Sequence, residues 1–156
     1  MTLPVNYGPV TAQYTSLPTG SGMAVGQTYP IANSNAEKVL VQNNPSGSTL
    51  AIGAALKFTS GSASSYVVDA TTAATDVCIG VADNPTTTVP AGSYFWMSTK
   101  GFCSPLVANG TAFGKVLEPS GTAGVLQATA GDNQGNISSA AAQSGGGNTQ
   151  TLCWFQ

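Results

Sequence analysis

The sequence contains no histidine and no arginine, and it carries little charge of either sign. Charged residues make up 6% of its 156 residues, whereas a typical soluble domain has about 25%. Without histidine, neither a Ser-His-Asp triad nor a Cys-His pair can form, and the usual proton carrier of general acid–base catalysis is missing. We therefore expect a protein that is not an enzyme and that uses no cofactor.

Positive charge is especially scarce. The four basic residues, all lysines, are dispersed along the chain and form no basic stripe that would neutralise phosphates, so we expect no binding to nucleic acid. No run approaches the roughly 20 apolar residues of a membrane span, so we also expect no membrane partner. The first residues, Met1 to Pro4, lack the basic and apolar regions of a secretory signal, which predicts synthesis and assembly in the cytoplasm.

The three cysteines are widely spaced, and no Cys-x-x-Cys motif is present. A zinc site is therefore not expected, because zinc ligands come in closer pairs or together with histidine. Cys78, Cys103 and Cys153 each stand among apolar residues, where a thiol packs as a small hydrophobe. We expect them to be reduced and structural in a reducing compartment.

Two other patterns have a chemical and a structural interpretation. Ser98 and Lys100 fall on one face of a predicted strand, which formally permits a Ser-Lys hydrolase, but no third group accompanies them. Asp69, Asp76 and Asp83 recur every seven residues without forming a calcium-loop motif. Turn residues surround these aspartates, so we expect solvated loop acids rather than a metal or catalytic site.

A surface with so little charge has two explanations. The chain is either a subunit of an assembly, whose surfaces are covered by neighbouring chains, or a Ser/Thr-rich monomer of the secreted type. Burying unpaired charge in an interface is costly, so a charge-poor surface suits an assembly. We favour that explanation.

Proline and glycine divide the chain into three predicted parts. Residues 1–36 contain four prolines and scattered tyrosines, which predicts an extended N-terminal arm. Residues 37–130 form the predicted β-rich core, and residues 131–156 a Gly/Ser-rich linker followed by a C-terminal docking strand. The arm either lies across a neighbouring subunit or folds back on its own domain, and the sequence leaves both open.

Within the core, short runs of apolar and β-branched residues recur between Gly, Pro, Asn and Ser turns. This spacing predicts an all-β fold, a small β-barrel or β-sandwich. Tyr94–Met97 is apolar on both faces, so we expect it to be covered on both sides. The Ala-rich stretch Ser138 to Gln143 is the one place where a short helix is predicted.

The chain ends in the apolar run Leu152-Cys153-Trp154-Phe155. Such a run is rarely left in water, so we predict a final strand that docks into the sheet or into a subunit interface. Tyrosine combines apolar area with a hydrogen-bonding tip and suits an interface. The predicted intersubunit contacts are Tyr7, Tyr14, Tyr29, Leu152, Trp154 and Phe155.

Several short motifs in the middle of the chain have a familiar order. Gly80-Val81-Ala82 is followed by the turn Ala91-Gly92-Ser93-Tyr94, by a strand ending near Lys100-Gly101, and by Gly114-Lys115-Val116-Leu117. In this order, residues 50–128 resemble the small β-barrel capsid decoration (cement) proteins of tailed double-stranded DNA bacteriophages. The resemblance covers about half the chain and leaves the arm and the C-terminal segment unexplained.

The resemblance implies a structural virion protein on the capsid exterior. It implies a homotrimer that binds the major capsid protein at three-fold positions and clamps neighbouring capsid subunits, which gives capsid stabilisation. Weak contacts would be multiplied by avidity over a symmetric shell. The alternative function is a phage head-fibre, tail or surface module that contacts host glycans.

Overall fold

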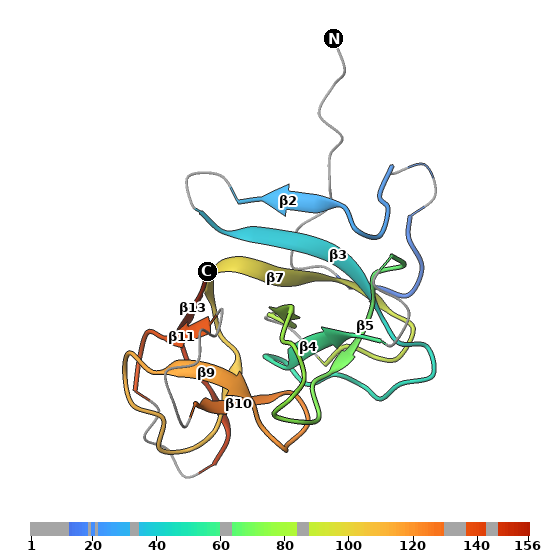
Figure 1. The fold of residues 1–156 in the computed structure, drawn as a ribbon. Coiled ribbons are helices and arrows are strands. Elements are labelled where there is room, and N and C mark those ends of the chain that lie inside the picture. The colour runs from blue at the N-terminus through green and yellow to red at the C-terminus, as the bar shows by residue number, and fades with distance from the viewer. Residues whose placement is uncertain are drawn as a thin grey trace.

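The structure, a computed structural model, describes residues 13–18, 20, 22–31, 35–59, 64–83, 88–129, 137–142 and 147–156. These residues form strands joined by turns and contain no helix, which confirms the predicted all-β class (Figure 1). All the strands belong to one connected hydrogen-bonded network. They are β1 (Gln13–Tyr14), β2 (Thr28–Pro30), β3 (Glu37–Asn43), β4 (Ala55–Phe58), β5 (Val67–Ala70), β6 (Gly80–Val81), β7 (Tyr94–Cys103), β8 (Leu106–Val107), β9 (Val116–Pro119), β10 (Val125–Ala128), β11 (Ile137–Ser139), β12 (Thr149–Gln150) and β13 (Cys153–Phe155).

Five of these strands close into a small barrel. The order β7-β6-β4-β5-β3 is antiparallel except for the parallel pair β3–β5, and β3 pairs again with β7 to complete the ring. Closure removes unpaired strand edges, which would otherwise attract other chains. Of the two predicted architectures, a small β-barrel or a β-sandwich, the structure therefore contains the barrel.

Alternate side chains from the barrel strands fill its interior. Val41, Leu56, Val68, Phe95 and Met97 are each at most 2% exposed and belong to one apolar cluster. Burying an aliphatic or aromatic side chain stabilises a fold by about 1.5–3 kcal/mol relative to leaving it in water. The alternation of inward and outward residues along β3, β4 and β7 follows from the two-residue period of a strand.

The C-terminal strands form a second, curved sheet in the order β12-β8-β10-β9-β11-β13-β7. Its apolar side packs on the outside of the barrel, where Ala55 of β4 and Val81 of β6 contribute to its core. Their chain neighbours Leu56 and Ala82 point into the barrel instead. The two cores thus share the strands β4 and β6, one on each face.

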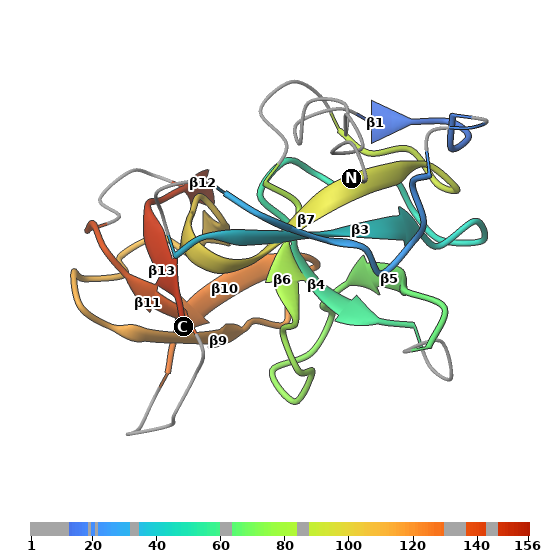
Figure 2. The ribbon, with the colours of Figure 1, turned by 90° about the horizontal axis from the view of Figure 1, so that it is seen from above.

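Strand β7 connects the two parts (Figure 2). Along one edge it pairs with β3, and along the other it pairs successively with β1, β6 and β13. Gly101, with φ of +85°, lies between the barrel and the C-terminal sheet, and a Cβ atom there would lie 2.7 Å from Ala36 Cα. A side chain at this position would be both strained and obstructed, so the glycine permits the close approach of the segment before β3.

The two apolar faces of Tyr94–Met97 are both covered, as predicted. Phe95 and Met97 point into the barrel, while Trp96 points outward and is 1% exposed. Tyr29 of β2 packs edge-on against Trp96, with ring centroids 6.0 Å apart. β2 pairs with β3, and β1 pairs with β7. The described part of the arm therefore folds back on its own chain, the second of the two alternatives.

The helix predicted at Ser138 to Gln143 is wrong for the described part of that stretch. Ile137–Ser139 is strand β11, which pairs with β9 and β13. Ile137 and Ser139 point inward, and Ser139 Oγ donates a 2.7 Å hydrogen bond to the carbonyl of Ala112. Alanine favours a helix locally, but pairing on both edges and burial of Ile137 outweigh that preference. The division at residues 36/37 and 130/131 stays a prediction.

Candidate interaction surfaces

The C-terminal end of β7 and the strand β13 present an aromatic pair to solvent. Phe102 lies directly opposite Trp154 in the antiparallel register, and the two rings meet edge to face with centroids 4.8 Å apart. Their chain neighbours Cys103, Cys153 and Phe155 point into the core. Strand alternation thus forces the intervening aromatic residues outward, and Phe102 is 59% exposed.

A cavity of about 320 Å³ borders this pair and is lined by Asn35, Ala36, Gly101, Phe102 and Trp154. We call it the aromatic groove. None of the described residues that line it carries a charged side chain. Exposed aromatic rings in a concave, uncharged site are typical of protein contact surfaces, where they supply much of the binding energy.

The uncharged surface continues across the C-terminal sheet. Trp154 lies opposite Ser138, and Ser138 lies opposite Val116, so one row of outward side chains crosses β13, β11 and β9. Leu152 flanks this row and is 46% exposed. A partner covering this row would bury apolar area without having to desolvate a charge, whereas Glu118, two residues beyond Val116 on the same side of β9, marks the charged limit of the row.

The residues predicted as intersubunit contacts differ in their burial and in their place in the fold. Tyr14 and Tyr29 are half-buried on β1 and β2, and Tyr7 lies outside the described residues. Leu152 and Trp154 are next to the aromatic groove, whereas Phe155 is 4% exposed in the C-terminal core. Their role as contacts between subunits stays a prediction.

Phe102 is the groove residue that the sequence analysis missed. The most prominent aromatic run of β7 in the sequence, Tyr94–Met97, lies at the beginning of the strand, whereas Phe102 lies near its end. The available signal was the alternation Gly101-Phe102-Cys103, in which a small buried residue on each side of Phe102 points that ring outward. Its pairing with Trp154 depends on the register between β7 and β13, which local sequence does not specify.

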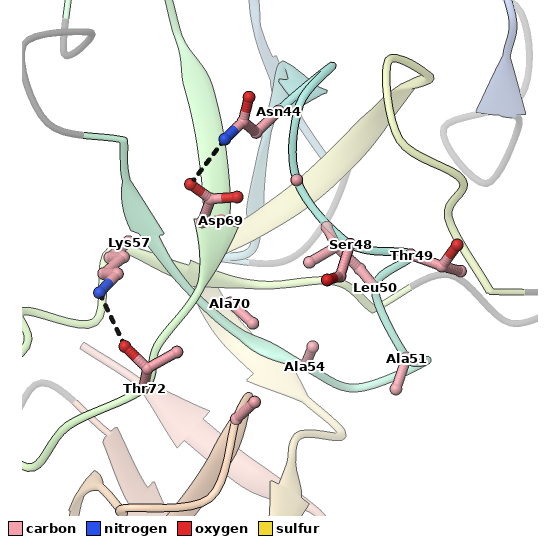
Figure 3. A pocket seen from close by; sticks show the side chains of 12 residues that line it. Asn44, Ser48, Thr49, Leu50, Ala51, Ala54, Lys57, Asp69, Ala70 and Thr72 are labelled. Atoms are coloured by element: carbon pink, nitrogen blue, oxygen red, sulfur yellow. Dashed lines mark hydrogen bonds between the residues drawn. The ribbon is translucent and has the colours of Figure 1, made fainter.

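A second cavity, of about 480 Å³, lies beside the loop between β3 and β4 (Figure 3). Leu50, Ala51, Ala54 and Ala70 give it apolar walls, and polar groups stand around them. Asp69 Oδ2 accepts hydrogen bonds from Asn44 Nδ2 (3.1 Å) and from Thr59 Oγ1 (3.0 Å). Asp69 belongs to β5, so its predicted placement in a solvated loop is wrong.

Lys57 brings positive charge to the rim of this cavity, and its charge is neutralised there. Its Nζ lies 2.9 Å from Asp76 Oδ2 and donates to Thr72 Oγ1 at 3.1 Å. Asp76 Oδ2 also accepts from the backbone N–H groups of Thr72 (2.6 Å) and Ala73 (3.0 Å). These backbone bonds, and then Lys57, hold the pKa of Asp76 at about 2, below its ordinary value of 3.8.

This carboxylate is expected to fix the loop between β5 and β6. A depressed pKa means that the ionised form favours folding, so its contribution is present above pH 3.8 and is lost as the pH falls toward 2. Asp76→Asn should lower the free energy of unfolding at neutral pH by about 1–2 kcal/mol. It should also flatten the decline in stability between pH 4 and pH 2, as measured by urea unfolding at several pH values.

Glu118→Gln is the matched control for this prediction. Glu118 Oε1 accepts a 3.2 Å hydrogen bond from Gln127 Nε2, which an amide oxygen can also accept. The control should leave the free energy of unfolding within about 0.5 kcal/mol of the original. Equal destabilisation by the two substitutions would contradict a specific role for Asp76.

Two classes of site have no counterpart among the described residues. No three His, Cys, Asp or Glu side chains in this part of the chain lie close enough together to hold a metal ion. The same residues include no helix with the length and hydropathy needed to cross a membrane.

Comparison with known proteins relates the chain to a solved structure. No family model and no curated protein matches it. Its fold is similar to that of the head fibre gp8.5 N base of bacteriophage phi29, with a TM-score of 0.56 and 10% sequence identity. The match covers 78% of this chain and 94% of that chain. At this identity the match establishes a shared fold.

Proposed function

We propose that this protein is a structural component of a bacteriophage virion that attaches to the exterior of the capsid. The observation that carries the proposal is the fold likeness to a phage head-fibre base over 94% of that chain. The motifs of residues 50–128, which resemble those of capsid decoration proteins, support attachment to a phage capsid independently of the fold likeness.

The surface of the chain suits such an attachment. The aromatic groove and the uncharged row across β13, β11 and β9 can be covered without desolvating charge. Each contact of this kind is weak, and repetition over a symmetric shell would multiply the weak contacts. In this proposal the protein acts by binding, with the major capsid protein as its partner, and performs no catalysis.

The finer proposal is that the protein cements the capsid as a homotrimer. A trimer at a three-fold position would touch several capsid subunits at once and resist their separation. Such a trimer would carry six aromatic rings at its grooves, two from each copy, and these rings would anchor it to the capsid. The charge-poor surface supports this, because surfaces against other subunits do not need charge for solubility.

A second candidate is the base of a head fibre, and the described structural match favours it specifically. A fibre base and a cement protein both bind the capsid exterior, but they differ in effect. A cement protein raises the temperature at which capsids break open, whereas a fibre base binds without this stabilisation. Contact with host glycans would be a further property of a fibre or surface module.

Binding to purified capsids of the parent phage tests the proposal. The protein is expected to sediment with capsids in a saturable manner, and saturation in multiples of three together with a raised disruption temperature would support cementing. Saturable binding with an unchanged disruption temperature would support the fibre base. Absence of co-sedimentation, together with retention on a glycan array, would contradict capsid attachment.

A further inference from the structure

Two of the three cysteines face each other across neighbouring strands. The antiparallel register of β7 and β13 places Cys103 directly opposite Cys153. Both side chains point to the same side of the sheet, into the C-terminal core, and they are 2% and 0% exposed. The two sulfur atoms therefore share one dry compartment.

The backbone hydrogen bonds define the type of this pair. Thr151 N–H donates to the carbonyl of Pro105 at 3.0 Å, two residues along the same ladder, and hydrogen-bonded pairs recur every two residues. Ala140 N–H donates to the carbonyl of Leu152, so the polar groups of the next residue, Cys153, point to β7. Cys103 and Cys153 are thus a hydrogen-bonded pair, with Cα atoms about 5.5 Å apart.

This spacing is compatible with a covalent link. Disulfides join residues whose Cα atoms are roughly 4.4–6.8 Å apart. Residues directly opposite each other on antiparallel strands have Cβ atoms about 4.5–5.5 Å apart, and a disulfide needs about 3.5–4.5 Å. In a hydrogen-bonded pair the Cβ atoms lie at the wider end of this range, so the two strands must approach each other by about 1 Å or more. Local opening and reclosing of the short strand β13 permits this approach.

We propose that Cys103 and Cys153 form a disulfide when the protein meets a thiol-oxidising environment, such as one containing a small-molecule disulfide. Each thiol gives up one proton and one electron, an S–S bond forms between the two sulfur atoms, and the S–S bond of glutathione disulfide is reduced to two thiols. The link fastens β13 to β7. This inference does not depend on the proposed function.

Burial controls how easily the reaction begins. It raises the pKa of the Cys153 thiol to about 11, and it raises that of Cys103 as well, with a further contribution from the neighbouring Cys153. Thiolate is the reactive form, so both groups are protected while the strands are closed. Oxidation therefore requires local opening of β13, after which the closing strands bring the second sulfur to the mixed disulfide.

Cys78 is outside this pair. It is half-buried in the segment before β6, and its Sγ lies 3.4 Å from the carbonyl of Gly80 as a hydrogen-bond donor. It packs against the same C-terminal core but belongs to neither of the two strands that bring the other cysteines together. Cys78→Ala therefore serves as a matched control that removes a thiol and leaves the pair intact.

The experiment is incubation of the folded full-length protein with glutathione disulfide, followed by thiol titration in denaturant and peptide mapping without reduction. The original chain should fall from three titratable thiols to one, and Cys78→Ala from two to none. The map should contain one peptide pair, linking Cys103 to Cys153. Cys103→Ala and Cys153→Ala should show no intramolecular link.

Two outcomes would overturn the proposal. One is a chain that keeps all three thiols, or gains only glutathione adducts, after oxidation long enough for repeated local opening. The other is a link that involves Cys78. Because the peptide map of the original chain decides between these outcomes, the test holds even where an alanine variant folds poorly.

Discussion

A chain that ends at Thr151 is expected to lose its native fold. The deletion removes β13, which lies between β7 and β11 and pairs with both. It also removes Cys153 and Phe155, which are 0% and 4% exposed in the C-terminal core. Truncating a single buried Phe to Ala costs about 3–5 kcal/mol, and a whole domain is stable by only about 5–15 kcal/mol. The loss of a strand and its core residues is comparable with that total.

Circular dichroism and thermal unfolding of the purified truncated chain measure this effect. Without β13, the edges of β7 and β11 lack their shared partner, so we expect aggregation as well as loss of the unfolding transition. Leu152→Ser is the control, since Leu152 is exposed and its removal leaves the strand in place. A truncated chain that unfolds at the same temperature as the original would contradict the structural role of β13.

The elements predicted best from sequence are apolar runs that the chain's own core buries. The run Lys38–Gln42, which the Asn43-Asn44-Pro45 turn ends, predicts a strand and forms β3, and the docking strand expected at the C-terminus is β13. In β13 buried residues alternate with the half-buried Trp154, whereas in β3 the consecutive residues Leu40 and Val41 are both buried. Local sequence carries this information because the apolar residues of both strands pack inside the same chain.

Two other apolar runs, Thr49–Ile52 and Val77–Ala82, predict longer strands from their composition than the structure contains. Of the run Thr49–Ile52, Leu50 alone forms a bridge, to Val89, and Gly53 then turns with φ of +80°. In the run Val77–Ala82, Gly80 and Val81 alone form a strand, and Val77 is 72% exposed. An apolar run does not reveal how many of its residues find a partner, because pairing depends on strands that are distant in the sequence.

The closure of the barrel could not be predicted for the same reason. It requires β3 to pair with β7, from Glu37↔Lys100 to Gln42↔Tyr94. These two strands are separated in the sequence by more than half the length of the core. The aromatic groove is even harder to predict from sequence, since it exists only where β7, β13 and the segment before β3 meet. Composition alone indicated that the surface is charge-poor, and the structure shows where its exposed aromatic rings are.

Replacing both rings of the aromatic groove is expected to abolish attachment to capsids. In the double variant Phe102→Thr/Trp154→Thr, affinity should fall by about 100-fold or more, since central aromatic anchors typically contribute 2 kcal/mol or more each. The prediction rests on the proposed function. Threonine keeps a high strand propensity, and Phe102 is 59% exposed, so the fold should survive. Co-sedimentation with capsids over a range of protein concentrations measures the change.

The stability of the double variant separates a binding defect from a folding defect. Loss of the edge-to-face contact between the two rings should cost about 0.5–1.5 kcal/mol, and loss of the buried part of the half-buried Trp154 adds to the fall in the unfolding temperature. Val77→Thr is the matched control, because Val77 is 72% exposed in the loop before β6 and does not line the groove. It should bind capsids like the original chain. Capsid binding by the double variant at the original affinity would show that the groove is not part of the attachment surface, because the two rings are the largest side chains that line it.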